Sequence, residues 1–118
     1  GSTSGIGLAY AKALAAEGAA VMINGFGDAD AIEAQCRDLA ALSGAKVLWS
    51  GADMLQPDQI AAMVDTCHAE LGGPDILINN AGITRDTLML RMTEQQWDDV
   101  IETNLKSAFN LTKAFLKH

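Results

Sequence analysis

Two patterns of apolar residues alternate along the chain. Short unbroken apolar runs are typical of buried strands, and they occur at 19–23, 46–50 and 75–79. Elsewhere apolar residues recur every three or four positions, which indicates helices with one buried face. Glycines that can end a helix follow these stretches, so that helices are predicted after Gly7, between 28 and Gly44, and from Pro57 to 72.

A further helix is predicted from Thr93 to the end of the chain. Thr93 and Gln96 have the spacing of a capping box. The expected core-facing stripe consists of Trp97, Ile101, Asn104, Ala108, Thr112 and Phe115. A second apolar face, formed by Val100, Phe109 and Leu116, indicates either burial within the domain or contact with a partner helix.

The alternation of strands and helices predicts an α/β fold. Right-handed crossovers give a doubly wound parallel sheet of the Rossmann-like kind, covered by helices on both faces. We expect one partial domain over residues 1–118, incomplete at both ends, because no strand precedes the glycine-rich turn at the start and no stop signal follows the last helix. Ligands of such sheets bind outside the carboxyl ends of the strands.

Composition excludes several classes of protein. The net charge of −7 argues against a nucleic-acid or anionic-membrane surface, and no apolar run approaches the ~20 residues of a membrane span. Cys36 and Cys67 have no metal-ligand spacing and fall on apolar helix faces, which is typical of buried thiols in a reducing cytoplasm. His68 and His118 have no third ligand nearby, so that no metal site is expected.

The first seven residues, "GSTSGIG", have the composition of a phosphate-binding turn. Gly1, Gly5 and Gly7 allow close backbone approach, and Ser2, Thr3 and Ser4 supply hydroxyl and main-chain donors at a helix N-terminus. No Gly-Lys-Ser/Thr follows, which excludes a P-loop. A tight turn with glycines used only for packing remains the alternative.

Four features in order resemble the short-chain dehydrogenase/reductase family. They are the Gly-x-x-x-Gly-Ile-Gly spacing, Asp53 after the second of the apolar runs, "NNAG" at 79–82, and Asn104 within "TNL". The resemblance implies that Gly1 to Gly7, Ile6 included, wraps a pyrophosphate and that Asp53 and Met54 bind adenine. It also implies that Asn80, Ala81 and Gly82 border the ribose and the floor of the cofactor site, with one asparagine of the pair tying neighbouring strands.

The same resemblance gives Asn104 a catalytic role, holding a water in a proton relay. The alternative is a core asparagine with satisfied hydrogen bonds that kinks its helix. Phe26 is predicted either to lie against the adenosine or to be a capping hydrophobe. NAD is the expected cofactor, with NADP possible, because Asp28 and Asp30 would repel an extra phosphate and Ser4 stands where NADP-using relatives often have a basic residue.

The first part of the chain resembles 3-hydroxybutyrate dehydrogenases, and the second part resembles 3-oxoacyl-thioester and acetoacetyl-CoA reductases. Thr84 replaces the glutamine of the dehydrogenases. Both imply a small 3-hydroxy or 3-oxo substrate, and the family also implies a homo-oligomer through the last helix. The catalytic Ser and Tyr-x-x-x-Lys are absent, since Tyr10 is the sole tyrosine and lies in the first helix. We therefore expect no turnover by this chain alone. A non-catalytic NAD(H)-binding module is the alternative of another class.

Overall fold

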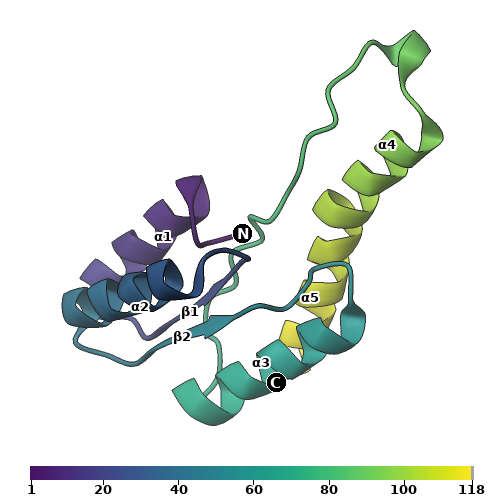
Figure 1. Cartoon of the computed structure of the whole chain (residues 1–118). Helices are drawn as coiled ribbons and strands as arrows, with labels where there is room; N and C mark the ends of the chain where they lie inside the picture. The colour runs from purple at the N-terminus through teal and green to yellow at the C-terminus, as the bar shows by residue number, and fades with distance from the viewer. Residues whose placement is uncertain (118) are drawn as a thin grey trace.

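The computed structural model describes residues 1–117 and has two strands between layers of helices. The elements in chain order are α1 (Gly5–Ala16), β1 (Val21–Asn24), α2 (Ala29–Ser43), β2 (Val47–Ser50), α3 (Pro57–Leu71), the 3-10 turn η1 (Met89–Arg91), α4 (Glu94–Val100), the π-helical turn η2 (Ile101–Lys106) and α5 (Ser107–Phe115). Strands β1 and β2 are parallel, with Val21 opposite Val47. Figure 1 shows α1 and α2 together on one side of the strands and α3 with α5 on the other. The expected α/β layering is confirmed.

The helix ends follow from local chemistry. The Asp28 side chain accepts a hydrogen bond from the Ala31 N–H at 3.0 Å, which caps the first turn of α2. Gly44 and Gly72 adopt left-handed conformations at the ends of α2 and α3, and Pro57 occupies the first turn of α3. The predicted starts and ends of α2 and α3 agree with the structure to within a few positions.

The core lies between α1, α2 and the sheet. Its buried members are Ala11, Ala15, Val21, Ile23 and Leu39. The two alanines of α1 have no bulk beyond Cβ, so that the helix packs closely on β1. A second set, Ile60 and Val64, buries one face of α3.

The apolar run at 75–79 is not a strand, which corrects the sequence-based prediction. The segment makes no ladder of hydrogen bonds within the described residues. Ile76 is 62% exposed and Ile78 is 44% exposed. A strand makes its ladder hydrogen bonds only with a neighbouring strand, and neither β1 nor β2 pairs with this segment.

The last predicted helix is interrupted by a π-helical turn. The capping box is confirmed, since Gln96 N–H donates to Thr93 Oγ1 at 3.2 Å and Thr93 N–H donates to Gln96 Oε1 at 3.0 Å. The single core-facing stripe is wrong: Trp97 and Asn104 are exposed, whereas Ser107 is 5% exposed. The extra residue of a π turn rotates the helix positions that follow it, so that one stripe cannot run through both α4 and α5.

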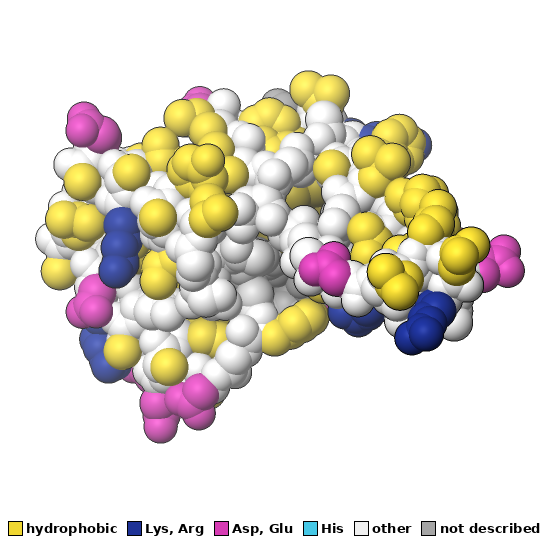
Figure 2. All heavy atoms as spheres, turned by 90° about the horizontal axis from the view of Figure 1, so that it is seen from above, with side chains coloured by type: hydrophobic (Ala, Val, Ile, Leu, Met, Phe, Trp, Pro, Cys, Tyr) yellow, Lys and Arg dark blue, Asp and Glu magenta, His cyan; other side chains and the backbone are white. Residues whose placement is uncertain are grey.

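An extended arm connects the region around the sheet with helix α4. Residues 80–93 leave the sheet region and reach η1 at the far tip, from which α4 returns (Figure 1). Leu88, Met89 and Leu90 at this tip are exposed. Seen from above, apolar side chains gather on the protruding part at the right of Figure 2. None of the helices within residues 1–117 combines the length and the apolar character needed to cross a bilayer.

Candidate dinucleotide site

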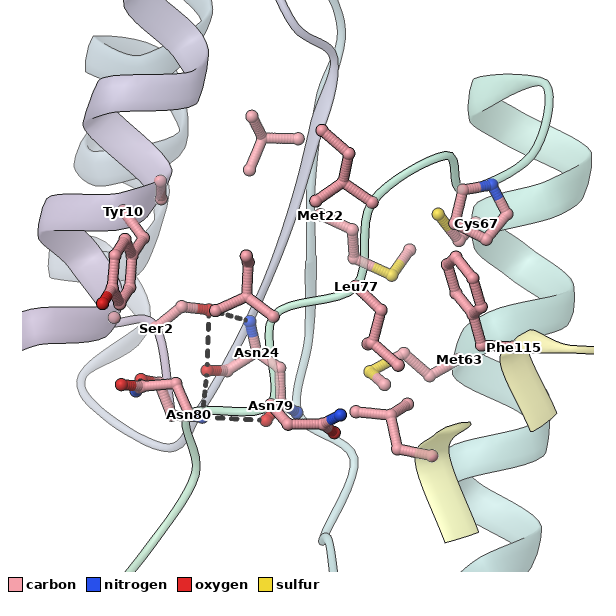
Figure 3. Close-up of a pocket in the computed structure, with 18 of the residues that line it drawn as sticks. Ser2, Tyr10, Met22, Asn24, Met63, Cys67, Leu77, Asn79, Asn80 and Phe115 are labelled. Atoms are coloured by element: carbon pink, nitrogen blue, oxygen red, sulfur yellow. Dashed lines mark hydrogen bonds between the residues drawn. The ribbon is translucent and has the colours of Figure 1, made fainter. Parts of the chain in front are cut away.

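The glycine turn is bonded to the carboxyl end of β1. Ser2 N–H donates to the Asn24 carbonyl at 2.6 Å, Asn24 N–H donates to Ser2 Oγ at 2.7 Å, and Gly1 N donates to the same carbonyl at 2.8 Å. Figure 3 shows Ser2 and Asn24 facing each other across these bonds. Asn24 Nδ2 also donates to the carbonyls of Ser50 and Ala52, at the end of β2. Asn24 therefore fixes the turn to both strand ends.

The first turn of α1 presents free backbone donors. Ser4 is the N-cap residue in an extended conformation, and its side chain makes no capping hydrogen bond. The N–H groups of Gly5, Ile6 and Gly7 have no acceptor among the described residues, and the first helical bond is Leu8 N–H to the Ser4 carbonyl at 3.1 Å. Such N–H groups carry the positive end of the helix dipole and bind anions. The turn can therefore hold a phosphate.

Two of the glycines are required by geometry. Gly5 has a φ of +54°, which residues with a side chain rarely adopt. A Cβ at Gly7 would lie 2.6 Å from Asn80 Nδ2 and would also collide with the backbone of Gly1. The two interpretations of the turn, phosphate binding and packing, are therefore compatible. Gly7 is needed for close packing, whereas Gly5 gives the first turn of α1 its open backbone conformation.

The two asparagines of "NNAG" both make structural bonds. Asn80 Nδ2 donates to the Gly1 carbonyl at 2.6 Å, and Asn79 Nδ2 donates to Thr112 Oγ1 on α5 at 3.2 Å. Ala81 is also close to the turn, since a Cβ on Gly1 would lie 2.7 Å from the Ala81 Cα. The structure thus brings Asn80 and Ala81 against the glycine turn, as the predicted site requires.

Asp53 and Met54 follow the end of β2. Asp53 Oδ1 accepts from Leu55 N–H at 2.9 Å, which leaves Oδ2 without a hydrogen bond among the described residues. The Asp53 N–H donates to Gln59 Oε1 at 2.9 Å. The Met54 side chain is buried. Asp53 therefore has one free acceptor, and any contact between Met54 and a ligand falls to its main chain or the outer part of its side chain.

Phe26 lies in the same region with its ring exposed. Phe26 is 69% exposed, and its carbonyl accepts from Thr3 Oγ1 at 3.3 Å. Trp49 Nε1 donates to the neighbouring Gly25 carbonyl at 2.9 Å. An exposed ring is available to stack on a flat ligand, whereas a capping hydrophobe would be covered by its helix.

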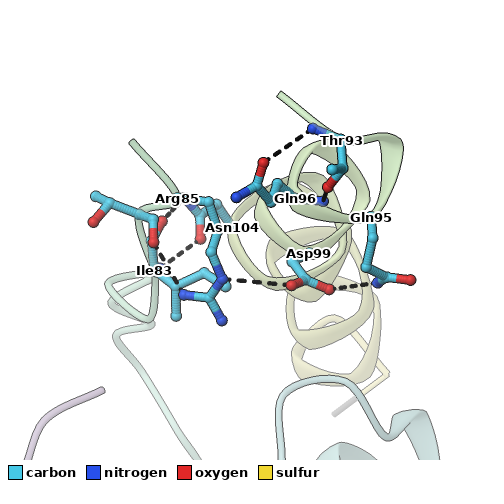
Figure 4. A network of polar contacts seen from close by, with 8 residues as sticks. Ile83, Arg85, Thr93, Gln95, Gln96, Asp99 and Asn104 are labelled. Atoms are coloured by element: carbon cyan, nitrogen blue, oxygen red, sulfur yellow. Dashed lines mark hydrogen bonds and ion pairs between the residues drawn. The ribbon is translucent and has the colours of Figure 1, made fainter. Parts of the chain in front are cut away.

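Asn104 lies in the π-helical turn, facing the residue after "NNAG". Its Oδ1 accepts from Ile83 N–H at 2.8 Å, and its Nδ2 donates to the Ile83 carbonyl at 2.9 Å (Figure 4). A Cβ on Gly82 would be 3.3 Å from the Asn104 Oδ1, so that Gly82 packs against the same amide. Asn104 is exposed rather than buried. The amide thus has the hydrogen-bond partners expected of a satisfied asparagine, but it does not lie in the core.

A cavity of about 360 Å³ joins many of these groups. Its polar end includes Ser2, Asn24 and Asn80, and its apolar end includes Met22, Leu77, Met63, Cys67 and Phe115, as Figure 3 shows. The predicted site residues Gly1, Ser2, Gly7, Met54, Asn80, Ala81 and Asn104 line it. Thr3, Ser4, Gly5, Ile6, Phe26, Asp53 and Gly82 do not line it. The apolar end is lined by side chains from β1, residues 76–78, α3 and α5.

Two residues of the site were not predicted from the sequence. Asn24 fixes the glycine turn to both strand ends, as described above. The sequence feature that could have indicated this role is a polar residue between an apolar run and a glycine. Gln35 on α2 donates from Nε2 to the Thr3 carbonyl at 2.8 Å. The sequence feature that could have indicated Gln35 is its helical spacing with Ile32 and Leu39, which places a polar side chain on the inward face of α2.

The two thiols are not among the predicted site residues, although Cys67 lines the apolar end of the cavity. Cys36 and Cys67 are free, and burial raises the pKa of both thiols, with Glu33 adding to the effect at Cys36. Within residues 1–117 no group of three His, Cys, Asp or Glu side chains can hold a metal ion.

The chain was compared with known proteins. The family model for short chain dehydrogenase matches residues 1–118. D-beta-hydroxybutyrate dehydrogenase of Cupriavidus necator is 47% identical over 116 residues, which cover 98% of this chain and 44% of that protein. The 3-oxoacyl-[acyl-carrier-protein] reductase FabG of Chlamydia muridarum is 40% identical over 117 residues, covering 99% of this chain and 47% of that protein.

Solved structures agree with this match. L-sorbose reductase from Gluconobacter frateurii, complexed with NADPH and L-sorbose, has a TM-score of 0.89 and 31% identity over 99% of this chain and 44% of its own. The chain belongs to the short-chain dehydrogenase family, and its fold is that of the family's Rossmann-like domain. It spans less than half the length of these relatives. Both kinds of relative match along nearly the whole chain, so that both resemblances are confirmed but are not divided between its first and second parts.

Proposed function

We propose that residues 1–118 form the dinucleotide-binding part of an NAD(P)-dependent oxidoreductase that interconverts 3-hydroxy and 3-oxo groups. The observation that carries the proposal is the set of free N–H groups of Gly5, Ile6 and Gly7 at the start of α1, held against the end of β1 by Asn24. Its substrate class follows from the relatives named D-beta-hydroxybutyrate dehydrogenase and 3-oxoacyl-[acyl-carrier-protein] reductase. The nicotinamide ring, when bound, supplies or accepts the hydride.

Each predicted residue then has a role that its geometry permits. The turn from Gly1 to Gly7 binds the pyrophosphate through main-chain N–H groups. The free oxygen of Asp53 accepts from the adenine amino group, and Phe26 lies against the adenosine. The segment from Asn80 to Gly82 borders the ribose. Its packing against the turn supports this arrangement.

Asn104 holds a water through the hydrogen-bonding groups that its two bonds to Ile83 leave unused. An asparagine amide can make four hydrogen bonds, and Ile83 uses one on each end. One Oδ1 lone pair and one Nδ2 hydrogen therefore remain to hold a water. Because Asn104 is exposed, water reaches it directly.

NADH binding by this chain tests the proposal, with fluorescence titration as the measurement. Gly5→Ala forces a side chain into a φ of +54° at the first turn of α1 and should weaken NADH binding at least tenfold. Gly44→Ala is the matched control, because Gly44 has a φ of +67° and equally open surroundings but lies at the end of α2. Equal affinities of the two variants, or no binding by the unaltered chain at millimolar NADH, would contradict the proposal.

We propose NAD rather than NADP as the preferred cofactor. The segment from Asn24 to Asp30 contains no lysine or arginine, and Asp28 and Asp30 place carboxylates at the start of α2 beside the turn. Ser4→Arg should raise NADPH affinity relative to NADH, because Ser4 is exposed and would present a cation there. Gln95→Arg makes the same charge change on α4 and should leave the ratio of the two affinities unchanged.

A second candidate is an NADPH-dependent 3-oxoacyl-thioester reductase. Thr84 supports it, since the dehydrogenases have a glutamine at that position. Rates of 3-hydroxybutyrate oxidation with NAD and of acetoacetyl-CoA reduction with NADPH, measured on the whole enzyme, separate the two. A non-catalytic NAD(H)-binding module is distinguished by tight NADH binding without either activity.

The last helix supports association between copies of the chain. Leu105, Phe109 and Leu116 are exposed along η2 and α5 and border an apolar groove. We propose that this face contacts a second copy. Phe109→Asp should shift the sedimentation coefficient to that of a monomer, whereas Asn110→Asp, one position along, should not.

A further inference from the structure

Gln35 connects helix α2 to the glycine turn. Its Nε2 donates to the Thr3 carbonyl at 2.8 Å, across 32 positions of sequence. Helices α1 and α2 lie side by side, so that the bond spans the junction between them (Figure 1). The residue shares the inward side of α2 with Ile32 and Leu39, which are buried.

The other end of the same amide has no partner. Gln35 Oε1 is buried and makes no hydrogen bond within the described part of the chain. A buried acceptor left unpaired is unfavourable for folding, and an apolar residue of similar size would avoid that cost. A flip of the side-chain amide would not satisfy this oxygen, because Oε1 would then face the Thr3 carbonyl oxygen. The arrangement thus keeps one hydrogen bond to the turn at the expense of an unpaired oxygen.

The bond fixes the direction of the next N–H group. The peptide between Thr3 and Ser4 is planar and trans, so that the Ser4 N–H points opposite to the Thr3 carbonyl. Because Gln35 holds that carbonyl toward α2, the Ser4 N–H points away from α2. Ser4 is exposed at the open start of α1, beside the free N–H groups of the first turn.

No other hydrogen bond holds this peptide plane among residues 1–117. Asn24 bonds to Gly1 and Ser2, which precede it. The Thr3 hydroxyl bonds to the Phe26 carbonyl at 3.3 Å, but that bond leaves the Thr3 carbonyl free to rotate.

We propose that Gln35 is a positioning residue that aims the Ser4 N–H at the anion held by the glycine turn. The inference rests on the proposed function for the identity of that anion, a pyrophosphate. It deepens that function by adding a residue from α2, which contributes no group to the predicted site. Gln35 itself touches the backbone of the turn and not the ligand.

Three variants test the proposal. Gln35→Met removes both the donor and the unpaired oxygen while keeping the length of the side chain. Gln35→Glu replaces the donor by a carboxylate that faces the Thr3 carbonyl. Cys36→Ala is the matched control, since Cys36 is the next residue of α2 and packs on the core without a bond to the turn. Each variant is measured by urea unfolding, by NADH and inorganic pyrophosphate titration, and by the amide NMR signal of Ser4.

Gln35→Met should retain the stability of the unaltered chain yet bind NADH about tenfold more weakly, since one charge-assisted hydrogen bond is lost. Gln35→Glu should weaken binding further. Cys36→Ala should lose stability and keep its affinity. Unchanged NADH affinity in Gln35→Met, or the same loss in Cys36→Ala, would overturn the proposal.

The NMR measurement keeps the two proposals apart. In ligand-free protein, Gln35→Met should move the Ser4 amide signal, because the Thr3–Ser4 peptide loses its fixed orientation, while Cys36→Ala should leave that signal unchanged. If the unaltered chain binds neither NADH nor pyrophosphate, the proposed function fails and the Ser4 signal still decides whether Gln35 holds the peptide. An unmoved Ser4 signal refutes the positioning role whatever the affinities are.

Discussion

Replacing Asn104 by alanine removes both hydrogen bonds between η2 and the backbone of Ile83. These bonds are 2.8 and 2.9 Å long and satisfy the N–H and the carbonyl of one residue. Each is worth roughly 0.5–1.5 kcal/mol net, and the exposed position of Asn104 favours the lower half of that range. The pair should therefore contribute about 1–2 kcal/mol to holding the arm at residue 83 against the helix.

Hydrogen exchange at the Ile83 amide measures this contribution directly. A loss of about 1–2 kcal/mol corresponds to exchange roughly 5- to 30-fold faster in Asn104→Ala, by the usual relation between free energy and population. Asn104→Asp keeps the acceptor for the Ile83 N–H but turns an oxygen toward the Ile83 carbonyl. At neutral pH it should exchange at least as fast as the alanine variant, and protonation at low pH should slow it by restoring a donor.

Asn110→Ala is the control for this experiment. Asn110 lies on α5, and its side chain makes no hydrogen bond within residues 1–117. Its replacement should leave exchange at Ile83 unchanged. If Asn104→Ala also left that exchange unchanged, the hydrogen-bonded pair would not hold the arm and the structural role assigned to Asn104 would be wrong.

Three further predictions concern packing, charge and thiol reactivity. Gly7→Ala should lower stability to urea by about 1–3 kcal/mol through overpacking, although helix propensity alone predicts a gain of about 1 kcal/mol, and a more stable variant would refute the close approach. The hydrogen bond from Lys46 lowers the pKa of the Glu70 carboxyl. The small stabilisation from this pair is therefore present above the ordinary carboxyl pKa and is lost as the pH falls through the lowered value. The difference in urea midpoint between the unaltered chain and Glu70→Gln should vanish in acid. Burial raises the pKa of the Cys36 and Cys67 thiols, so that iodoacetamide should label both more slowly in the folded chain than in urea at the same pH, and equal rates would contradict that burial.

The sequence predicted those parts of the fold that depend on local chemistry. Asp28, Gly44, Pro57 and the Thr93 capping box each act within one helix turn, so that a short stretch of sequence contains all of the relevant information. The glycine turn was predicted for the same reason. Its composition and spacing are properties of seven consecutive residues.

The parts that failed depend on neighbours far along the chain. The run at 75–79 has a strand's composition, but a strand also needs a partner that its own residues do not specify. Gln35 was missed because its role lies in a bond to Thr3, and helical spacing shows only that it faces inward. The stripe through Trp97 and Asn104 assumed an uninterrupted α-helix, and the extra residue of a π turn is not visible in apolar spacing alone.

The π turn at Ile101–Lys106 also determines which sequence changes the helix can tolerate. An α-helix turns by about 100° per residue, so that deleting one residue from this turn would rotate all of α5 by that angle relative to α4. The face that now packs on α3 would swing away, and no side-chain replacement could restore it. The segment should therefore accept many substitutions but no single-residue insertion or deletion, and alignments of functional homologues should keep its length constant even where its residues differ.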